Sequence, residues 1–138
     1  MKIKVSEQVK QQPAYASGDV GGAALRTFFN ITKAWGLDSE QERTLLGNPP
    51  TATYYRWRAA SATGALKLSQ GVIERISYVL GIYKALHILF NDNAQADAWV
   101  QKPNTAPLFG GASALDRMLG GQVADLYRVR EYLDSQRG

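Results

Sequence analysis

The chain has 138 residues, and 45% of them are hydrophobic, which is enough to bury a core and argues against wholesale disorder. It contains no cysteine, no apolar run long enough to span a bilayer and no hydrophobic secretory segment, so we expect a cytoplasmic protein that does not enter a membrane. The formal net charge is +4, and residues 51–90 carry an equal excess, which either marks a binding surface for an acidic partner or reflects chance scatter.

Residues 1–19 show no sustained helical or strand period, and we interpret them as an N-terminal arm. From Ala23 to Trp35 the apolar residues recur at helical spacing, which predicts a first helix that ends at Gly36. A second, short helix follows, with Ser39 and Glu42 at the spacing of a capping box. The run 47–50, Gly-Asn-Pro-Pro, then predicts a sharp turn because proline fixes φ.

A third helix is expected to begin near Thr51, so that the two short helices and the turn between them outline a helix-turn-helix. We expect Tyr54 and Trp57 to face the core. The opposite face would carry hydroxyl and guanidinium groups suited to phosphates and base edges, and these candidate DNA-binding residues are Thr51, Thr53, Tyr55, Arg56 and Arg58. The alternative is an ordinary helical hairpin with exposed arginines. The double proline lengthens the turn, and Arg43 stands where a small residue is commoner.

The longest helix is predicted to run from Ser69 or Gln70 to Phe90, where Asn91-Asp92-Asn93 stops it. Its broad apolar stripe indicates that it packs against both halves of the protein, and a stripe this wide could also contact a second copy of the chain. These features divide the chain into the arm at 1–19, a helix-turn-helix domain at 20–90 and a C-terminal module at 91–138. A short helix ending at Trp99 opens that module, and we expect Trp99 to be buried.

The C-terminal module is strongly punctuated. Pro103 and Pro107 break any helix, Gly110-Gly111 permits positive φ, and Ser113 with Asp116 resembles a capping box that starts a short helix. After Gly120-Gly121 a last helix begins. Val123, Leu126 and Val129 could hold it to the module, whereas its mixed aromatic, aliphatic and charged residues suit an interface, and these candidates are Tyr127, Arg130, Leu133, Asp134 and Arg137.

Two segments resemble a known family. The pattern Trp99, Pro103-Asn104, Pro107-Leu108-Phe109-Gly110-Gly111, Ser113-Ala114-Leu115-Asp116 and Val123-Ala124-Asp125-Leu126-Tyr127 resembles the toxin-binding domain of Xre/MbcA/ParS-type antitoxins. The stretch Thr53-Tyr54-Tyr55-Arg56-Trp57 is similar to the recognition helix of Xre-like helix-turn-helix domains. The resemblance implies the antitoxin of a type II toxin-antitoxin system. Its partner would be a RES-domain toxin that degrades NAD⁺, and the C-terminal helix and tail would occlude the toxin's active site.

Catalysis by this chain is not expected, and no cofactor or metal is predicted. His87 is the only histidine and lies within the apolar stripe, so the sequence offers neither a catalytic triad nor a cluster of metal ligands. Neither glycine pair follows a predicted strand, so a phosphate-binding loop is not credible either.

We therefore predict an all-α protein in which a helix-turn-helix half is joined by a long helix to a small helical toxin-binding module. Its expected partners are a RES-domain toxin, operator DNA and a second copy of itself, which would make it an antitoxin and an autorepressor. The alternative is a plain helix-turn-helix transcription regulator whose C-terminal module only dimerises. A more distant alternative is a structural adaptor without affinity for DNA.

Overall fold

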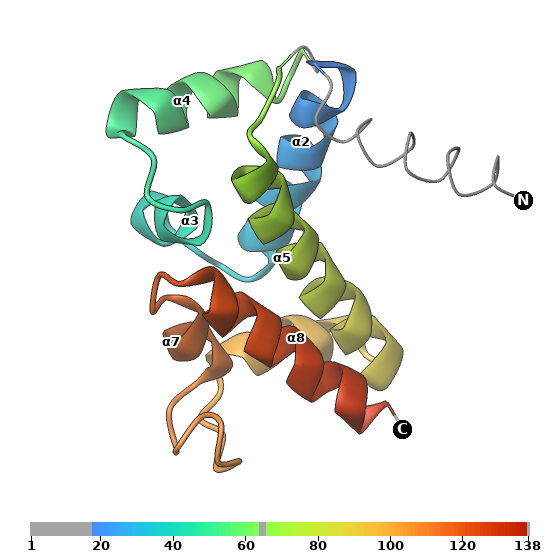
Figure 1. The fold of residues 1–138 in the computed structure, drawn as a ribbon. Coiled ribbons are helices and arrows are strands. Elements are labelled where there is room, and N and C mark those ends of the chain that lie inside the picture. The colour runs from blue at the N-terminus through green and yellow to red at the C-terminus, as the bar shows by residue number, and fades with distance from the viewer. Residues whose placement is uncertain (1–17, 64–65, 138) are drawn as a thin grey trace, which may run out of the picture.

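The structure, a computed structural model, describes residues 18–63 and 66–137, and these ranges are predominantly α-helical (Figure 1). The predicted arm therefore lies almost entirely outside the described residues. The elements, in chain order, are α2 (Gly18–Ala34), α3 (Ser39–Leu45), α4 (Thr51–Ala60), α5 (Gln70–Leu89), α6 (Asn93–Ala98), the 3₁₀ helix η2 (Trp99–Gln101), α7 (Ala114–Met118) and α8 (Val123–Gln136). The all-α prediction is confirmed. No helix within the described ranges is long and apolar enough to cross a membrane.

Helix α5 is the axis of the molecule. The Ser69 side chain caps it by accepting a hydrogen bond from the Val72 amide, and it ends at Phe90, as its apolar period predicts. Helix α2 packs along one side of α5 and α8 along another (Figure 1). The buried residues that face these neighbours include Ile73, Ile76, Val79, Ile82 and Leu86. One helix thus joins both halves of the chain into a continuous apolar core.

Helix α2 begins at Gly18, five residues earlier than the sequence predicts. Glycines weaken a helix, so the sequence predicts that the glycine-rich segment 18–22 precedes the first helix rather than forming part of it. The structure gives Gly21 a packing role: a Cβ built there would lie 1.8 Å from the carbonyl oxygen of Leu66. The absence of a side chain lets the segment before α5 pass directly over α2, and this tertiary contact outweighs the low helix propensity.

The start of α3 differs from the prediction by one residue. Asp38, not Ser39, is the N-cap, and Gln41, not Glu42, completes the capping box. Glu42 is left free to turn inward, where it is buried. The turn that follows contains Gly47 at φ 98° and Asn48 at φ 59°, so the chain reverses sharply before α4, as predicted.

The C-terminal module is built from short elements tied together by loops. Ser113 and Asp116 form the predicted capping box of α7. Gly110 and Gly111 adopt positive φ in the loop before it. The ring of Trp99 is stacked on that of Tyr132 at 6.4 Å, and Phe109 meets both rings edge-on. Trp99 is therefore an aromatic anchor, although it is half-buried rather than fully buried.

Candidate functional site

Helices α3 and α4 and the turn between them form the predicted helix-turn-helix. In this motif the second helix presents side chains near its N-terminus to DNA. Pro50 precedes α4 and provides no side-chain cap, and the first residue of the helix is Thr51. Tyr54 is 1% exposed and fixes α4 to the core, as predicted, while Trp57 is half-buried.

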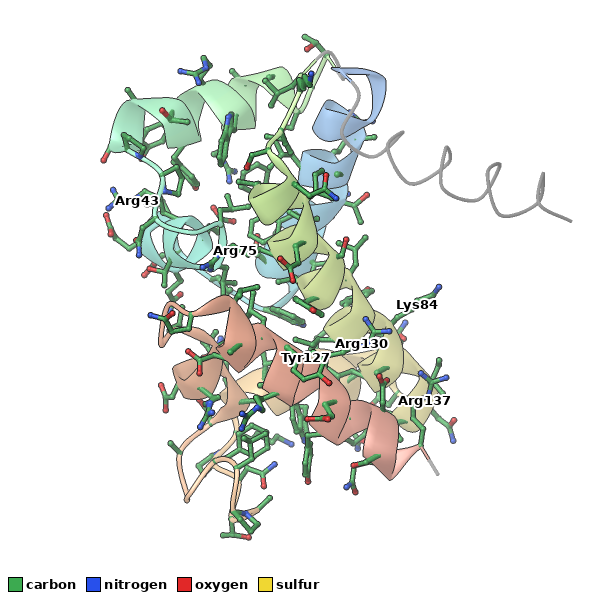
Figure 2. All side chains as sticks on the ribbon, in the orientation of Figure 1. Arg43, Arg75, Lys84, Tyr127, Arg130 and Arg137 are labelled. Atoms are coloured by element: carbon green, nitrogen blue, oxygen red, sulfur yellow. The ribbon has the colours of Figure 1, made fainter. Side chains whose placement is uncertain are left out.

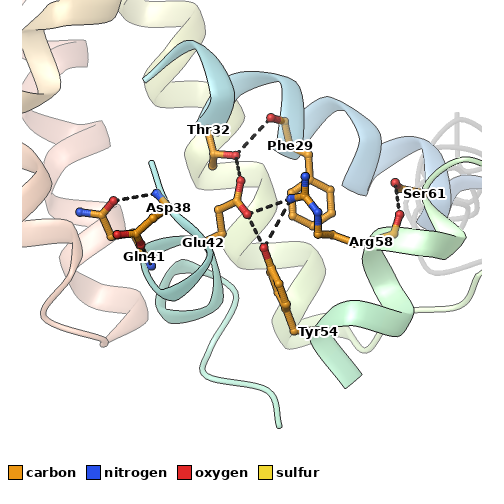
Figure 3. A network of polar contacts seen from close by, with 8 residues as sticks. All are labelled: Phe29, Thr32, Asp38, Gln41, Glu42, Tyr54, Arg58 and Ser61. Atoms are coloured by element: carbon orange, nitrogen blue, oxygen red, sulfur yellow. Dashed lines mark hydrogen bonds and ion pairs between the residues drawn. The ribbon is translucent and has the colours of Figure 1, made fainter. Parts of the chain in front are cut away.

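A buried carboxylate joins α2, α3 and α4 (Figure 3). Glu42 is 6% exposed and accepts hydrogen bonds from the hydroxyls of Thr32, at 2.5 Å, and Tyr54. Arg58 lies 2.9 Å from the same carboxylate, and its guanidinium covers the ring of Phe29 at 4.5 Å. Both carboxylate oxygens are therefore occupied, which is the condition for burying such a group without a large penalty.

This network also perturbs a tyrosine. Burial, together with the hydrogen bond to the Glu42 carboxylate, raises the pKa of Tyr54 to about 12. Tyr54 therefore stays protonated at neutral pH and donates a hydrogen bond to Glu42. The orientation of α4 relative to α2 and α3 is fixed by this hydrogen bond and by the Glu42–Arg58 ion pair rather than by apolar packing alone.

The structure separates the five candidate DNA-binding residues. Tyr55 is 55% exposed, Thr51 and Arg56 are also exposed, and Thr53 is half-buried. Arg58 was expected on the same open face, and its side chain is 46% exposed, but its guanidinium turns back to pair with Glu42 and to cover the ring of Phe29. Arg58 differs from the other candidates in being held by an ion pair, because the buried carboxylate of Glu42 requires a cationic partner. The open face at the start of α4 is therefore made by Thr51, Tyr55 and Arg56.

Sequence reasoning did not assign a role to Arg43. Its guanidinium donates a hydrogen bond to the Thr51 hydroxyl at 2.7 Å, so a cation from α3 lies at the N-terminus of α4. Its charge is only weakly opposed, because Glu40 lies 3.8 Å away and is largely exposed. The sequence feature that could have indicated this role is the arginine itself, which stands where a small residue is commoner in such motifs.

The second candidate surface lies on α8. Leu126, Val129 and Leu133 are buried and hold this helix to the rest of the molecule. Leu133 was predicted to contact the toxin, but it is 1% exposed and belongs to the core. Leu133 lies one turn beyond Val129 and two turns beyond Leu126, so the helical period places it in the buried stripe of α8.

The remaining candidates form a row along α8 in which Tyr127 is 44% exposed, Asp134 and Arg137 are also exposed, and Arg130 is half-buried. Figure 2 labels the tyrosine and the two arginines of this row. Tyr127 packs edge-on against Tyr78 of α5, with ring centroids 5.9 Å apart. Arg130 donates to Asp134 at 3.2 Å, and Arg137 approaches the other oxygen of the same carboxylate at 3.6 Å. We call Tyr127, Arg130, Asp134 and Arg137 the α8 row.

The two surfaces are connected through Arg75 of α5. Its guanidinium donates to the carbonyl oxygen of Gly121, just before α8, at 3.1 Å. Its Nε lies 3.1 Å from the position that a Cβ on Gly47 would occupy, in the turn before α4. One side chain therefore touches both the turn of the helix-turn-helix and the loop that starts α8.

The only histidine takes part in hydrogen bonds. One ring nitrogen of His87 lies 3.1 Å from the amide oxygen of Asn93, and the other lies 2.9 Å from a carboxylate oxygen of Asp97. These contacts hold α6 against the end of α5. In the ranges that the structure describes, no group of three or more histidine or acidic residues is arranged to hold a metal ion.

Comparisons with known proteins agree with this division into two surfaces. The antitoxin Xre-like helix-turn-helix domain matches residues 15–81, and the antitoxin Xre/MbcA/ParS C-terminal toxin-binding domain matches residues 85–138. A protein of Sinorhizobium fredii (strain NBRC 101917 / NGR234), described as uncharacterized protein y4oB, is 47% identical over 116 residues. That match covers 84% of this chain and 85% of the relative. No solved structure matched the chain.

Proposed function

This chain belongs to the antitoxins that combine an Xre-like helix-turn-helix domain with an Xre/MbcA/ParS toxin-binding domain, and we propose that it neutralises a RES-domain toxin. In this proposal, α8 and its tail cover the cleft in which the toxin degrades NAD⁺. The observation that carries the proposal is the construction of α8. Leu126, Val129 and Leu133 anchor one side of the helix, so the α8 row can contact a partner without loss of the core.

The test is inhibition of a purified toxin. A RES-domain protein encoded beside the gene for this chain would be co-expressed with it, and the complex would be purified and separated. NAD⁺ loss would then be followed with saturating full-length antitoxin and with a variant lacking residues 134–138. We expect full-length antitoxin to inhibit, and the truncated chain to bind while leaving the cleft open.

Two results would contradict parts of this proposal. Complete inhibition by the truncated chain would exclude occlusion by the tail and leave steric inhibition from the rest of the module. Failure of the RES-domain protein to bind the full-length chain would reject that toxin class. Arg128→Ala is the matched control, because Arg128 is exposed on the opposite side of α8 from the row.

The second part of the proposal is that α4 binds operator DNA and represses the chain's own operon. The exposed face at the start of α4 supports it, since Thr51, Tyr55 and Arg56 lie where helix-turn-helix proteins contact base edges. Fluorescence anisotropy with the promoter DNA of this gene would measure binding. If the chain binds this DNA but no toxin binds the chain, the alternative of a plain transcription regulator is favoured.

We further propose that the chain acts as a homodimer, because helix-turn-helix proteins usually read two half-sites. A groove of about 350 Å³ between α2 and α5 offers an apolar surface for that contact, and it is lined by Thr27, Asn30, Ile31, Leu80, Tyr83 and Lys84. Light scattering should report at least a dimer, and Leu80→Glu should produce a monomer. A wild-type monomer at micromolar concentration would contradict the dimer.

A further inference from the structure

We propose that the toxin-binding surface is composite: the α8 row is joined to an exposed stripe of α5, and together they receive an acidic face of the toxin. We call Ser77, Gly81, Lys84 and Ile88 the α5 stripe, because they recur at helical spacing along one side of α5. This inference rests on the proposed function. It extends the surface beyond the segment that matches the toxin-binding domain, because Ser77, Gly81 and Lys84 precede residue 85.

Gly81 carries the argument. It lies in the interior of a 20-residue helix, where glycine is less favourable than alanine, and it is not among the residues with positive φ. The structure supplies a different reason for it. A Cβ at Gly81 would lie 1.9 Å from Nη1 of Arg130, 2.5 Å from its Cζ and 2.9 Å from its Cδ. The Arg130 side chain therefore lies directly across the backbone of α5, and only glycine leaves room for it there.

The composite surface also holds most of the exposed large apolar side chains. Within the described ranges only three such residues are exposed, namely Tyr55 on α4, Ile88 at 56% and Tyr127 at 44%. Ile88 and Tyr127 belong to the α5 stripe and the α8 row, one on each side of Arg130. Lys84, Tyr127, Arg130 and Arg137 gather where α5 and α8 lie side by side (Figure 2). A surface that combines tyrosine and arginine side chains with aliphatic ones is typical of protein interfaces.

The charge of this surface selects the partner. Lys84, Arg130 and Arg137 are cationic, and Asp134 is the single acid of the stripe and the row. Glu131 borders the row and accepts a hydrogen bond from the Tyr127 hydroxyl at 3.3 Å, so three cations face two acids. Both arginines share the Asp134 carboxylate, at 3.2 and 3.6 Å, so their guanidinium groups retain capacity to bind further carboxylates. Lys84 also borders the groove proposed for the dimer contact, but a second copy seated on the α8 row would bring the same cations against its two arginines. Exposed isoleucine and tyrosine between cations suit a protein surface better than a phosphate backbone, so the occupant is an acidic face of the toxin.

The experiment uses the full-length chain and the RES-domain toxin that co-purifies with it. Gly81→Ala should displace Arg130 without unfolding α5, because the colliding atoms belong to the end of a flexible side chain and alanine favours helix. Ile88→Asp removes an exposed apolar contact and adds a repelling charge. We expect each variant to weaken toxin binding at least fivefold in calorimetry, with unchanged thermal melting and DNA affinity. Arg128→Ala, on the far side of α8, is the matched control and should bind as the wild type does.

Three outcomes would overturn the inference and are distinguishable from one another. If Gly81→Ala and Ile88→Asp bind toxin normally while Tyr127→Ala does not, α8 alone forms the interface, and the proposed function stands. If the two α5 variants change the oligomeric state instead, the surface joins copies of this chain. If the wild-type chain binds no RES-domain toxin, the proposed function fails together with this inference.

Discussion

Two arginines in this molecule are positioned in opposite ways. Arg58 on α4 is paired with the buried carboxylate of Glu42, whereas Arg130 on α8 lies over a glycine backbone and is paired with Asp134, which is 44% exposed. A buried carboxylate needs its cation, so Arg58 is committed to the framework. An exposed ion pair contributes little and exchanges readily with a partner's carboxylate, so Arg130 remains available for binding. The environment of the acid decides the role of each arginine.

The largest expected effect comes from the buried acid. Glu42→Ala should lower the free energy of unfolding by about 3 kcal/mol, because it leaves the buried hydroxyls of Thr32 and Tyr54 without their acceptor. Urea denaturation followed by circular dichroism would measure the loss. Glu40→Ala provides the control, since Glu40 is largely exposed and should change stability by less than about 0.5 kcal/mol.

The second effect should appear in binding rather than in folding. Tyr127→Ala and Arg130→Ala should each weaken toxin binding by about 2 kcal/mol if these side chains are central anchors. Stability should change less than binding, because Tyr127 is exposed and the half-buried Arg130 is paired with an exposed acid. Calorimetric titration of the toxin, paired with thermal melting of the free antitoxin, separates the two quantities. Equal losses in binding and in melting temperature would show that the α8 row is structural.

The third prediction compares Arg56 with Arg58 on the same helix. Arg56→Ala should weaken specific operator binding by about 1–3 kcal/mol if Arg56 reads a base edge. Arg58→Ala should reduce stability more than DNA affinity, and it should leave the salt dependence of binding nearly unchanged, because Glu42 already neutralises Arg58. Anisotropy titrations at several salt concentrations test both expectations. A flatter salt dependence for Arg58→Ala would instead make Arg58 a phosphate contact.

A smaller effect sharpens the contrast between the two acids. Asp134→Ala should lower the free energy of unfolding by less than about 1 kcal/mol, because the Arg130–Asp134 pair is exposed to solvent. The same denaturation measurement used for Glu42→Ala checks this value. A loss comparable with that of Glu42→Ala would mean that Arg130 is held as firmly as Arg58, and the comparison between the two arginines would fail.

The last prediction concerns the pH dependence of stability, and the effect appears only in alkaline solution. The pKa of Tyr54 is about 12 in the folded protein against about 10 for an unperturbed tyrosine. Between these values the folded state binds more protons than the unfolded state, so stability should fall as pH rises from about 10 to about 12. Tyr54→Phe should remove this component of the pH dependence. Denaturation midpoints measured across that range, with other tyrosines common to both proteins, provide the check.

Much of the fold followed from contacts within a few residues. The capping box of Ser113 and Asp116, the turn before α4 and the two ends of α5 depend on side chains that act on their own or adjacent turns. Sequence patterns detect such contacts directly because spacing fixes geometry within a helix. The exposed parts of the candidate surfaces, Arg56 and Tyr127 among them, were placed correctly by helical periodicity for the same reason.

Contacts between distant residues were decided by the tertiary structure alone. Glu42 and Arg58 are separated by sixteen residues and Arg75 and Gly121 by forty-six, and no local spacing announces either pair. The burial of Glu42 turned Arg58 away from the open face of α4, and close packing of α5 against α8 buried Leu133 and laid Arg130 over Gly81. The sequence by itself determined which helices form and most of their ends, but not the start of α2 or the N-cap of α3. Which arginine is paired with a buried acid and which with an exposed one depended on how those helices pack, because an ion pair takes its strength from the burial of its acid.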